Sequence, residues 1–349
     1  MHLEHSTLTS ISESIHDNDT DSEWDLTTKT EVVAFVWDGG TDITKALNNS
    51  TFVPAPCSAH LLQCVVRKAF LENPFVQNQM IQDVSTRWNS TLHMMKQLNE
   101  QKDAIIMASS RKDETISAEL TVDEWKKIEH LIDIMEIFDT ATLQLRKETS
   151  SVSEVIPSMQ VIQCHLEIPS PKGIGLQGLR NDLLVWLKQE FSFINTNELI
   201  AKATVLEPHF KMNPFQQEKH SVYLSSTEDS IVSEMEKISV THGLSPAEKN
   251  SLIPSIYVTP YSHTTARDEL NHYLNEPTIN PEGNPKAVGQ YWHDSEHRLK
   301  NVALKYLCVP SSTVSNERAF STARAICNVR EINLTLKERM LIFCHKNLQ

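Results

Sequence analysis

Asp38 is the first residue whose type and position could support chemistry. It directly follows Glu31–Trp37, a mostly apolar run of strand length. Nucleotidyl-transfer folds place a metal-holding carboxylate at the end of a buried strand, because the strand end fixes the direction of the side chain. Gly39 and Gly40 come next, and Asp-Gly-Gly is also an ordinary turn sequence. Spacing alone favours the turn, so both roles stay open.

Cys57 and His60 form a second candidate pair. They stand three residues apart and would face one another across the first turn of a predicted helix. Cys64 lies one turn further on, but no second ligand pair follows closely, whereas tetrahedral zinc needs four ligands. We therefore expect a hydrogen-bonded core pair in preference to zinc or a cysteine nucleophile.

The segment Asp83–Ser90 places Arg87 beside Trp88. A guanidinium can clamp a phosphate and an indole can stack on an unpaired base, so the two together suit nucleic acid. Tryptophan is also simply a large core residue, and without other information the core role is preferred.

A fourth candidate is the hydroxyl-rich segment Ser311–Ala323, which contains Glu317 beside Arg318. Serine and threonine favour helix starts, so the segment predicts a helix whose first turns carry a carboxylate and a cation. These two groups could reach the edge of a site. An exposed capping segment with an intrahelical ion pair is the alternative.

The elements that must position these residues are mostly helical. The run before Asp38 predicts one strand, and because a single strand is unstable we expect its neighbours to lie upstream, outside this sequence, or to be missing altogether. Apolar spacing predicts helices from about Leu61 to Phe70 and from Trp88 to Gln101.

Residues 103–197 continue in a helical pattern. Thr121–Glu124 has the form of a capping box ahead of an apolar stripe that begins at Trp125. Polar and Pro-rich stretches predict surface loops at 216–229 and 244–290, and the helical pattern returns from Tyr291.

Composition limits the function classes. The chain has 349 residues and 40% apolar content, which suffices for one large core or two smaller ones. No apolar run is long enough to span a bilayer. The net charge of -13 is uneven: residues 1–31 carry eight acids against Lys29, whereas residues 298–349 carry nine Lys/Arg against three acids. A polyanion would therefore favour the C-terminal part, although a solvated basic helix face would look the same.

Taken in order, these segments resemble the hAT-superfamily transposases and the host proteins derived from them, including the BED-type zinc finger family. The resemblance continues through Ala203–Lys211, Tyr291-Trp292 and Ser315–Ser321. The blocks around Arg87-Trp88 and Glu317 are its most specific parts.

The resemblance implies an α/β fold with a large helical insertion, in which a partial RNase H-like core leaves the chain mostly α-helical overall. We expect the first part of a truncated RNase H-like core in residues 1–102. A helical insertion domain with loops would occupy 103–285, and a C-terminal dimerisation segment that completes the core would occupy 286–349.

In such enzymes three carboxylates hold two Mg²⁺ ions that drive DNA strand cleavage and joining. Asp38 would match the second carboxylate and Glu317 the third. The first would lie on an upstream strand, for which the 37 residues before Asp38 are too few, and Gly39 stands where the family usually has Asn. We therefore expect an incomplete, inactive site with no cofactor, and Mg²⁺ only if the site were complete.

The same resemblance assigns nucleic-acid contacts. Cys57 and His60 would match the family pair near the site, and Trp88 the aromatic side chain that stabilises an extruded base. Arg87 and Arg318 would add cationic contacts. The amino-terminal zinc finger that gives the family its sequence-specific DNA binding is not found in this sequence.

Self-association is the main functional expectation. The C-terminal segment predicts an amphipathic helix with apolar residues that need a covering surface, whether within the chain or on a second copy. The residues expected at a dimer contact are Phe320, Met340, Leu341, Phe343 and Leu348. We thus expect a nuclear, transposon-derived homodimer with residual DNA binding, no membrane partner and no catalysis. The alternative is a Mg²⁺-dependent transposase or nuclease fragment that acts only with missing N-terminal parts.

Overall fold

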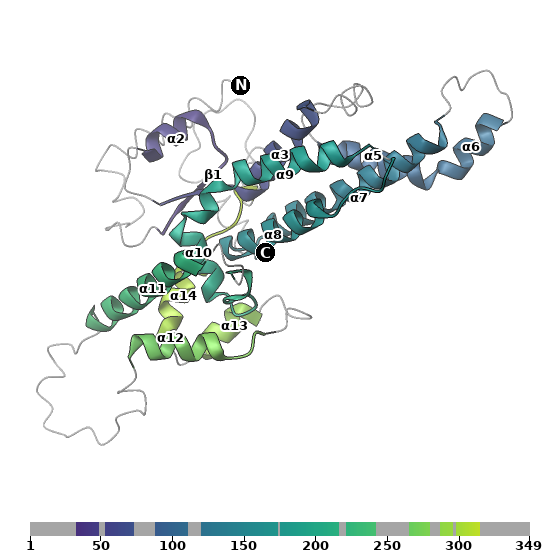
Figure 1. The fold of residues 1–349 in the computed structure, drawn as a ribbon. Coiled ribbons are helices and arrows are strands. Elements are labelled where there is room, and N and C mark those ends of the chain that lie inside the picture. The colour runs from purple at the N-terminus through teal and green to yellow at the C-terminus, as the bar shows by residue number, and fades with distance from the viewer. Residues whose placement is uncertain are drawn as a thin grey trace, which may run out of the picture.

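The computed structural model describes residues 33–48, 53–72, 88–110, 120–173, 175–215, 221–241, 265–279, 287–295 and 298–314. Helices dominate these ranges (Figure 1). The elements in chain order are β1 (Phe35–Trp37), α2 (Thr41–Asn48), β2 (Pro54–Pro56), α3 (Ser58–Glu72), α5 (Trp88–Glu100), α6 (Lys102–Ser110), α7 (Val122–Leu145), η1 (Val152–Glu154), α8 (Val155–Glu167), α9 (Gln177–Glu190), η2 (Ser192–Asn195), α10 (Glu198–Leu206), η3 (Asn213–Phe215), α11 (Ser221–Thr241), α12 (Ala266–Asn275), α13 (Ala287–Asp294) and α14 (Leu299–Leu307).

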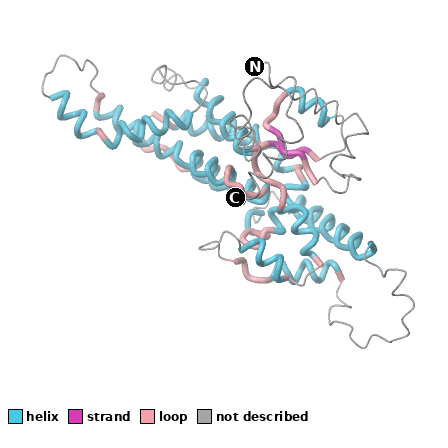
Figure 2. The backbone as a smooth tube through the Cα atoms, turned by 180° about the vertical axis from the view of Figure 1, so that it is seen from behind, coloured by secondary structure: helices cyan, strands magenta, loops and turns pink. Residues whose placement is uncertain are grey.

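The strand before Asp38 is confirmed as β1, and its partner corrects one expectation. β1 pairs in parallel with β2, which lies downstream, with Phe35 opposite Pro54 and Trp37 opposite Pro56. A Pro-Ala-Pro sequence is a poor strand signal, because proline cannot donate to a ladder and is confined to edges or strand starts. Figure 2 shows the two strands in magenta, close to the point where the helical parts of the chain meet.

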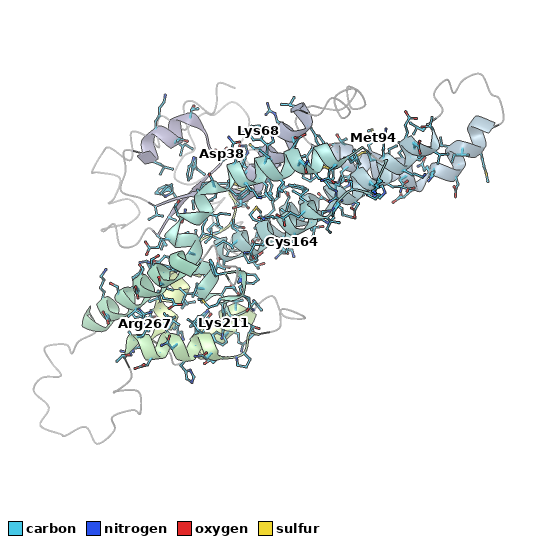
Figure 3. All side chains as sticks on the ribbon, viewed as in Figure 1. Asp38, Lys68, Met94, Cys164, Lys211 and Arg267 are labelled. Atoms are coloured by element: carbon cyan, nitrogen blue, oxygen red, sulfur yellow. The ribbon has the colours of Figure 1, made fainter. Side chains whose placement is uncertain are left out.

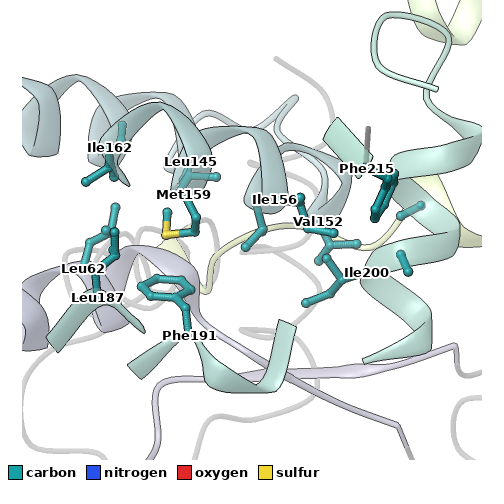
Figure 4. Packing of buried hydrophobic residues seen from close by; sticks show 14 of the residues in the cluster. Leu62, Leu145, Val152, Ile156, Met159, Ile162, Leu187, Phe191, Ile200 and Phe215 are labelled. Carbon is teal, nitrogen blue, oxygen red and sulfur yellow. The ribbon is translucent and has the colours of Figure 1, made fainter. Parts of the chain in front are cut away.

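Five helices form what we call the long bundle: α3, α5, α7, α8 and α9. α3 packs against α7 and α9, α5 against α7, and α8 against α7 and α9. Figure 4 shows Leu62 of α3, Ile162 of α8 and Leu187 of α9 converging in its interior. Each such side chain, once fully buried, contributes about 1.5–3 kcal/mol to the stability of the fold.

The long bundle follows the sequence predictions closely. Thr121 caps α7: its hydroxyl accepts from the Glu124 amide, while the Glu124 carboxylate accepts from the Thr121 amide at 2.7 Å. This reciprocal capping box was predicted from the Thr-x-x-Glu spacing. The stripe that starts at Trp125 is buried at Trp125, Leu131, Met135 and Phe138.

Helices α10 to α14 form what we call the short bundle, which lies beneath the long bundle in Figure 1, with α10 at the junction. Here two loop predictions were wrong. α11 begins at Ser221 within the predicted loop 216–229, and α12 with the start of α13 occupies part of the predicted loop 244–290. Thr265 caps α12 through a second capping box with Asp268, a signal that the sequence carried.

The polar sequence of α11 explains why it was missed. Its buried face includes Thr227, Ile231 and Met235, at a spacing of one helical turn, and its helicity depends on packing against α10, α12 and α14. The Glu234 carboxylate on this helix accepts from the buried Lys202 ammonium at 2.5 Å and from Lys305 at 3.0 Å. Tertiary contacts thus stabilise a segment whose own pattern favoured a loop.

The mostly helical character of the fold is confirmed. The described residues contain one two-stranded parallel pair, which is too little sheet to identify an RNase H-like core. Boundaries at residues 102 and 285 remain predictions. No described helix combines the length and the apolarity that crossing a membrane would require.

Candidate functional site

Asp38 lies at the C-terminal end of β1, as the sequence predicted, and it is exposed. One carboxylate oxygen, Oδ1, accepts from the Gly40 amide at 3.2 Å, while Gly39 takes a φ of +92°, which favours glycine. The Asp-Gly-Gly turn is therefore formed. A carboxylate can accept several hydrogen bonds, so this one bond leaves Asp38 with free acceptor sites at the strand end. Figure 3 labels its position.

Cys57 lies beside Asp38 at the same edge of the sheet. Its amide donates to the Trp37 carbonyl at 2.7 Å, so the two residues that follow the parallel strands are neighbours in space. Cys57 is 2% exposed, and its sulfur accepts from the amide and hydroxyl of Thr313 at 3.4 and 3.5 Å. Thr313 closes over the thiol from a distant part of the sequence.

His60 does not form the expected core pair with Cys57, because its side chain is exposed on α3. Cys57 at the helix start faces inward toward Thr313, while His60 falls on the outer side of the first turn. Within the described ranges no three His, Cys, Asp or Glu side chains are grouped so that they could hold a metal ion.

Residues 309–313, which we call the strap, connect α14 to this edge. The Val152 amide donates to the Val309 carbonyl at 2.9 Å, and the Ser311 amide donates to the Ser150 carbonyl at 3.3 Å. The Ser311 carbonyl accepts from the Ser58 amide at 3.0 Å, at the start of α3. The strap therefore ties the C-terminal part of the chain to the α7–α8 turn and to the strand edge that carries Asp38.

Buried hydroxyls fasten the strap further. Ser311 Oγ donates to the Leu145 carbonyl at 2.7 Å and lies 2.8 Å from Ser150 Oγ. Ser150 Oγ is also 3.1 Å from the Glu154 carboxyl, which accepts from Gln144 Nε2 at 2.8 Å. Sequence analysis missed this cluster, since nothing in the pattern links residues near 150 to residues near 311.

Trp88 begins α5 and is half-buried against the core, which fits the simpler interpretation of this residue. Its indole Nε1 is buried and has no hydrogen-bond partner among the described residues. The neighbouring Asn89 donates to the buried Asp139 carboxylate at 2.7 Å, which fixes the start of α5 against α7. A base-stacking role for Trp88 remains a prediction.

The block Ala203–Lys211 has a structural role at the end of α10. A helix leaves its last carbonyls without partners, and here two side chains supply them. Tyr273 OH of α12 donates to the Val205 carbonyl at 3.2 Å, and Trp292 Nε1 of α13 donates to the Leu206 carbonyl at 3.2 Å. Both aromatic side chains are fully buried.

Lys211, labelled in Figure 3, follows α10 and in turn supplies a donor to the end of α12. Its buried ammonium donates to the Tyr273 carbonyl at 2.6 Å and the Glu276 carbonyl at 2.9 Å, so it caps the end of α12. Burial lowers the pKa of this ammonium, partly offset by the Glu276 carboxylate. The segment Ala203–Lys211 therefore joins α10 to α12 and α13 through these hydrogen bonds.

Two carboxyl groups near the strap are shielded from water: Glu154 is half-buried and Glu207 is buried. Burial raises the pKa of Glu154 above its ordinary value, against smaller opposing effects from Gln144 and Ser150. Burial also raises the pKa of Glu207, against an opposing bond from His209 Nδ1 at 2.6 Å. For both carboxyls, burial favours the neutral form more than water does.

Several predicted site residues lie outside the described residues: Arg87, Glu317, Arg318, Phe320, Met340, Leu341, Phe343 and Leu348. Their roles stay predictions. The strap nevertheless ends four residues before Glu317 in the sequence, and its Thr313 touches Cys57 beside Asp38.

These features define a mostly helical protein in which α12 to α14 pack into the core and the strap contacts the strand edge at Cys57. Two protein-family models match it: the hAT family C-terminal dimerisation region over residues 269–348, and the ZBED1 RNase-like helical domain over residues 72–134. The resemblance to hAT-derived proteins is therefore confirmed, and residues 269–348 are similar to the dimerisation region of that family.

Similar proteins include BED zinc finger proteins, which agrees with the resemblance to hAT-derived proteins. The chain is 24% identical over 288 residues to human zinc finger BED domain-containing protein 4, covering 78% of this chain and 24% of the relative. It is 28% identical over 290 residues to a protein of Talaromyces stipitatus named as a proposed transcriptional regulator, tpeD, covering 76% of this chain and 32% of that protein. Human zinc finger BED domain-containing protein 6 is 22% identical over 215 residues, 51% of this chain and 21% of the relative. The chain thus spans a third or less of the length of each of these relatives.

Proposed function

We propose that this protein is a transposon-derived, non-catalytic nuclear protein that forms a homodimer through its C-terminal region and binds DNA. The observation that carries the proposal is the match of residues 269–348 to the hAT dimerisation region. The names of the relatives, two BED zinc finger proteins and a proposed transcriptional regulator, support a role at DNA in the nucleus.

Residues 269–314, the described part of the matched region, indicate which residues are available for a dimer contact. Within residues 269–314 the large aromatic side chains Tyr273 and Trp292 are buried inside the same chain, where they hold α10. Among the described residues of this range, Leu304 is the large apolar side chain that is exposed. Self-association is therefore expected to use the apolar residues that follow the strap, foremost Phe343.

Light scattering of the purified chain over a concentration series, with wild type beside Phe343→Asp, tests this proposal. We expect a concentration-dependent dimer that the variant converts to a folded monomer, because a buried carboxylate at the contact costs several kcal/mol. Val185→Asp is the matched control, since Val185 is 60% exposed on α9 in the long bundle. A wild-type chain that stays monomeric at all concentrations would refute the homodimer.

We propose that the protein is non-catalytic because too few carboxylates are identified to hold two Mg²⁺ ions. Mg²⁺ prefers oxygen ligands held in octahedral geometry, and the described strand edge offers one carboxylate, Asp38, beside the sulfur of Cys57. The donors described there do not fit a two-metal site by themselves. The predicted third carboxylate, Glu317, would have to join Asp38, and the family's first carboxylate was not identified in this sequence.

A second candidate is a Mg²⁺-dependent nuclease fragment, favoured by the position of Asp38 at a strand end beside a strap that leads toward Glu317. It predicts DNA cleavage that requires Mg²⁺ and that Glu317→Gln abolishes. Cleavage in the wild type that this variant removes would establish the nuclease. No cleavage together with DNA binding would support the non-catalytic proposal.

A further inference from the structure

Three close oxygen–oxygen contacts run in series from the strap to Glu154. Ser311 Oγ is 2.7 Å from the Leu145 carbonyl, Ser150 Oγ is 2.8 Å from Ser311 Oγ, and Ser150 Oγ is 3.1 Å from Glu154 Oε2. Each contact has hydrogen-bond length, so each needs one hydrogen. Ser150 and Ser311 are buried, at 3% and 1% exposure.

The two serines supply only two hydrogens for these three contacts, because a hydroxyl carries one donor and a carbonyl none. An ionised carboxylate supplies none either. With Glu154 ionised, any assignment of the two hydrogens leaves one pair of oxygens in contact with no hydrogen between them, which is repulsive.

We propose that Glu154 carries a proton on Oε2 in the folded chain, and that this proton completes the series of hydrogen bonds that fastens the strap. The carboxyl then donates to Ser150, Ser150 donates to Ser311, and Ser311 donates to the Leu145 carbonyl. All three contacts are satisfied at once, and Oε2 still accepts from Gln144.

The surroundings of Glu154 favour this state. Burial raises the pKa of Glu154, and the charged or titratable groups that act on it are Lys147 after α7 and His209 after α10, which oppose the rise. The Glu207 carboxyl is hydrogen-bonded to His209, and Glu154, when ionised, raises the pKa of Glu207. The strap, Val-Pro-Ser-Ser-Thr, carries no titratable side chain.

The strap is thereby a latch that depends on one proton. As pH rises, Glu154 loses this proton to solvent, a contact at Ser150 or Ser311 becomes repulsive, and the strap loosens. Loosening withdraws Thr313 from the Cys57 sulfur, and it also releases the chain that leads into the second half of the dimerisation region. The inference concerns the strap itself and does not depend on the homodimer.

Alkylation of Cys57 measures the opening of the strap. The full chain is treated with iodoacetamide over a pH series, and each cysteine is quantified by peptide mass spectrometry, with Cys64 on the same helix as the internal reference. Glu154→Gln is the key variant, because its side chain stays neutral at every pH. Dividing the wild-type rate by the variant rate at each pH removes the intrinsic pH dependence of the thiol.

We expect this quotient for Cys57 to rise about tenfold as pH rises through the pKa of Glu154, the size of shift that one unmade buried hydrogen bond produces in an opening equilibrium. The quotient for Cys64 should stay constant. Ser311→Ala should make Cys57 reactive at low and high pH alike. A quotient for Cys57 that does not change with pH would overturn the proposal.

Glu207→Gln is the matched control, since the Glu207 carboxyl also has a raised pKa but bonds to Ser153 and His209. It must keep the pH dependence of Cys57; loss of the dependence in this variant would assign the latch to Glu207 and refute our assignment. Should Glu154→Gln fail to fold, hydrogen exchange of the Ser311 amide in the wild type decides. Protection that falls with pH supports the latch, and constant protection contradicts it.

Discussion

Removal of a single oxygen atom should reveal how strongly the contact between α12 and α10 stabilises the fold. Tyr273→Phe deletes the hydroxyl that donates to the Val205 carbonyl at 3.2 Å and leaves the ring in place. Tyr273 and Val205 are both 0% exposed, so water cannot readily replace the lost donor.

The expected cost follows from this burial. A buried carbonyl left without its donor costs about 1–3 kcal/mol, and no cavity of ring size forms, so we expect a loss of about 2 kcal/mol in the free energy of unfolding. Trp292→Phe removes the corresponding bond to the Leu206 carbonyl and also part of a fully buried indole, and should cost about 3 kcal/mol.

Urea denaturation followed by circular dichroism, at one fixed protein concentration, measures both variants. Val185→Ala, at a 60% exposed position on α9, is the control and should lie within about 0.5 kcal/mol of the wild type. The double variant should lose less than the sum of the two single losses, because Tyr273 and Trp292 are in contact at 5.1 Å between ring centroids. A Tyr273→Phe protein as stable as the control would refute the idea that α12 and α13 cap α10.

Three further predictions concern separate parts of the chain. Thr121→Ala removes the side-chain half of the α7 capping box, and thermal unfolding should report a loss of about 1 kcal/mol; an unchanged midpoint would show that the cap contributes nothing. The raised pKa of Glu207 means that the folded state binds its proton more tightly than the unfolded state does. Its stabilising contribution is therefore complete below the ordinary pKa of 4.5 and is lost as pH rises through the raised value, and Glu207→Gln should flatten the dependence of unfolding free energy on pH above 4.5. Arg318→Ala should reduce the slope of log affinity for duplex DNA against log salt concentration by about 1, as measured by fluorescence anisotropy; an unchanged slope would remove Arg318 from the DNA contact.

The sequence predicted elements whose stabilising signals are local. α7 was predicted because Thr121 and Glu124 form a cap and Trp125 starts a regular apolar stripe, and both signals act within a few turns of one helix. α11 was not predicted, because its packing on α10, α12 and α14 outweighs its own polar pattern. β2 was missed because proline carries no ladder donor.

In the candidate site, too, the features with local sequence signals could be predicted and the long-range contacts could not. The position of Asp38 at a strand end could be predicted from the apolar run before it. The partner of Cys57 could not, since His60 was near in sequence while Thr313 is 256 residues away. The hydroxyl contact between Ser150 and Ser311 likewise joins positions 161 residues apart, and no pattern in either segment identifies the other.

The separation of Cys57 and Thr313 has a consequence for synthesis of the chain on the ribosome. At about 5–20 residues per second, Thr313 is made roughly 13–50 s after Cys57. All five helices of the long bundle have time to form within that interval, since helices form in microseconds. The thiol of Cys57 must therefore wait for its contact with Thr313 until the strap has left the ribosome.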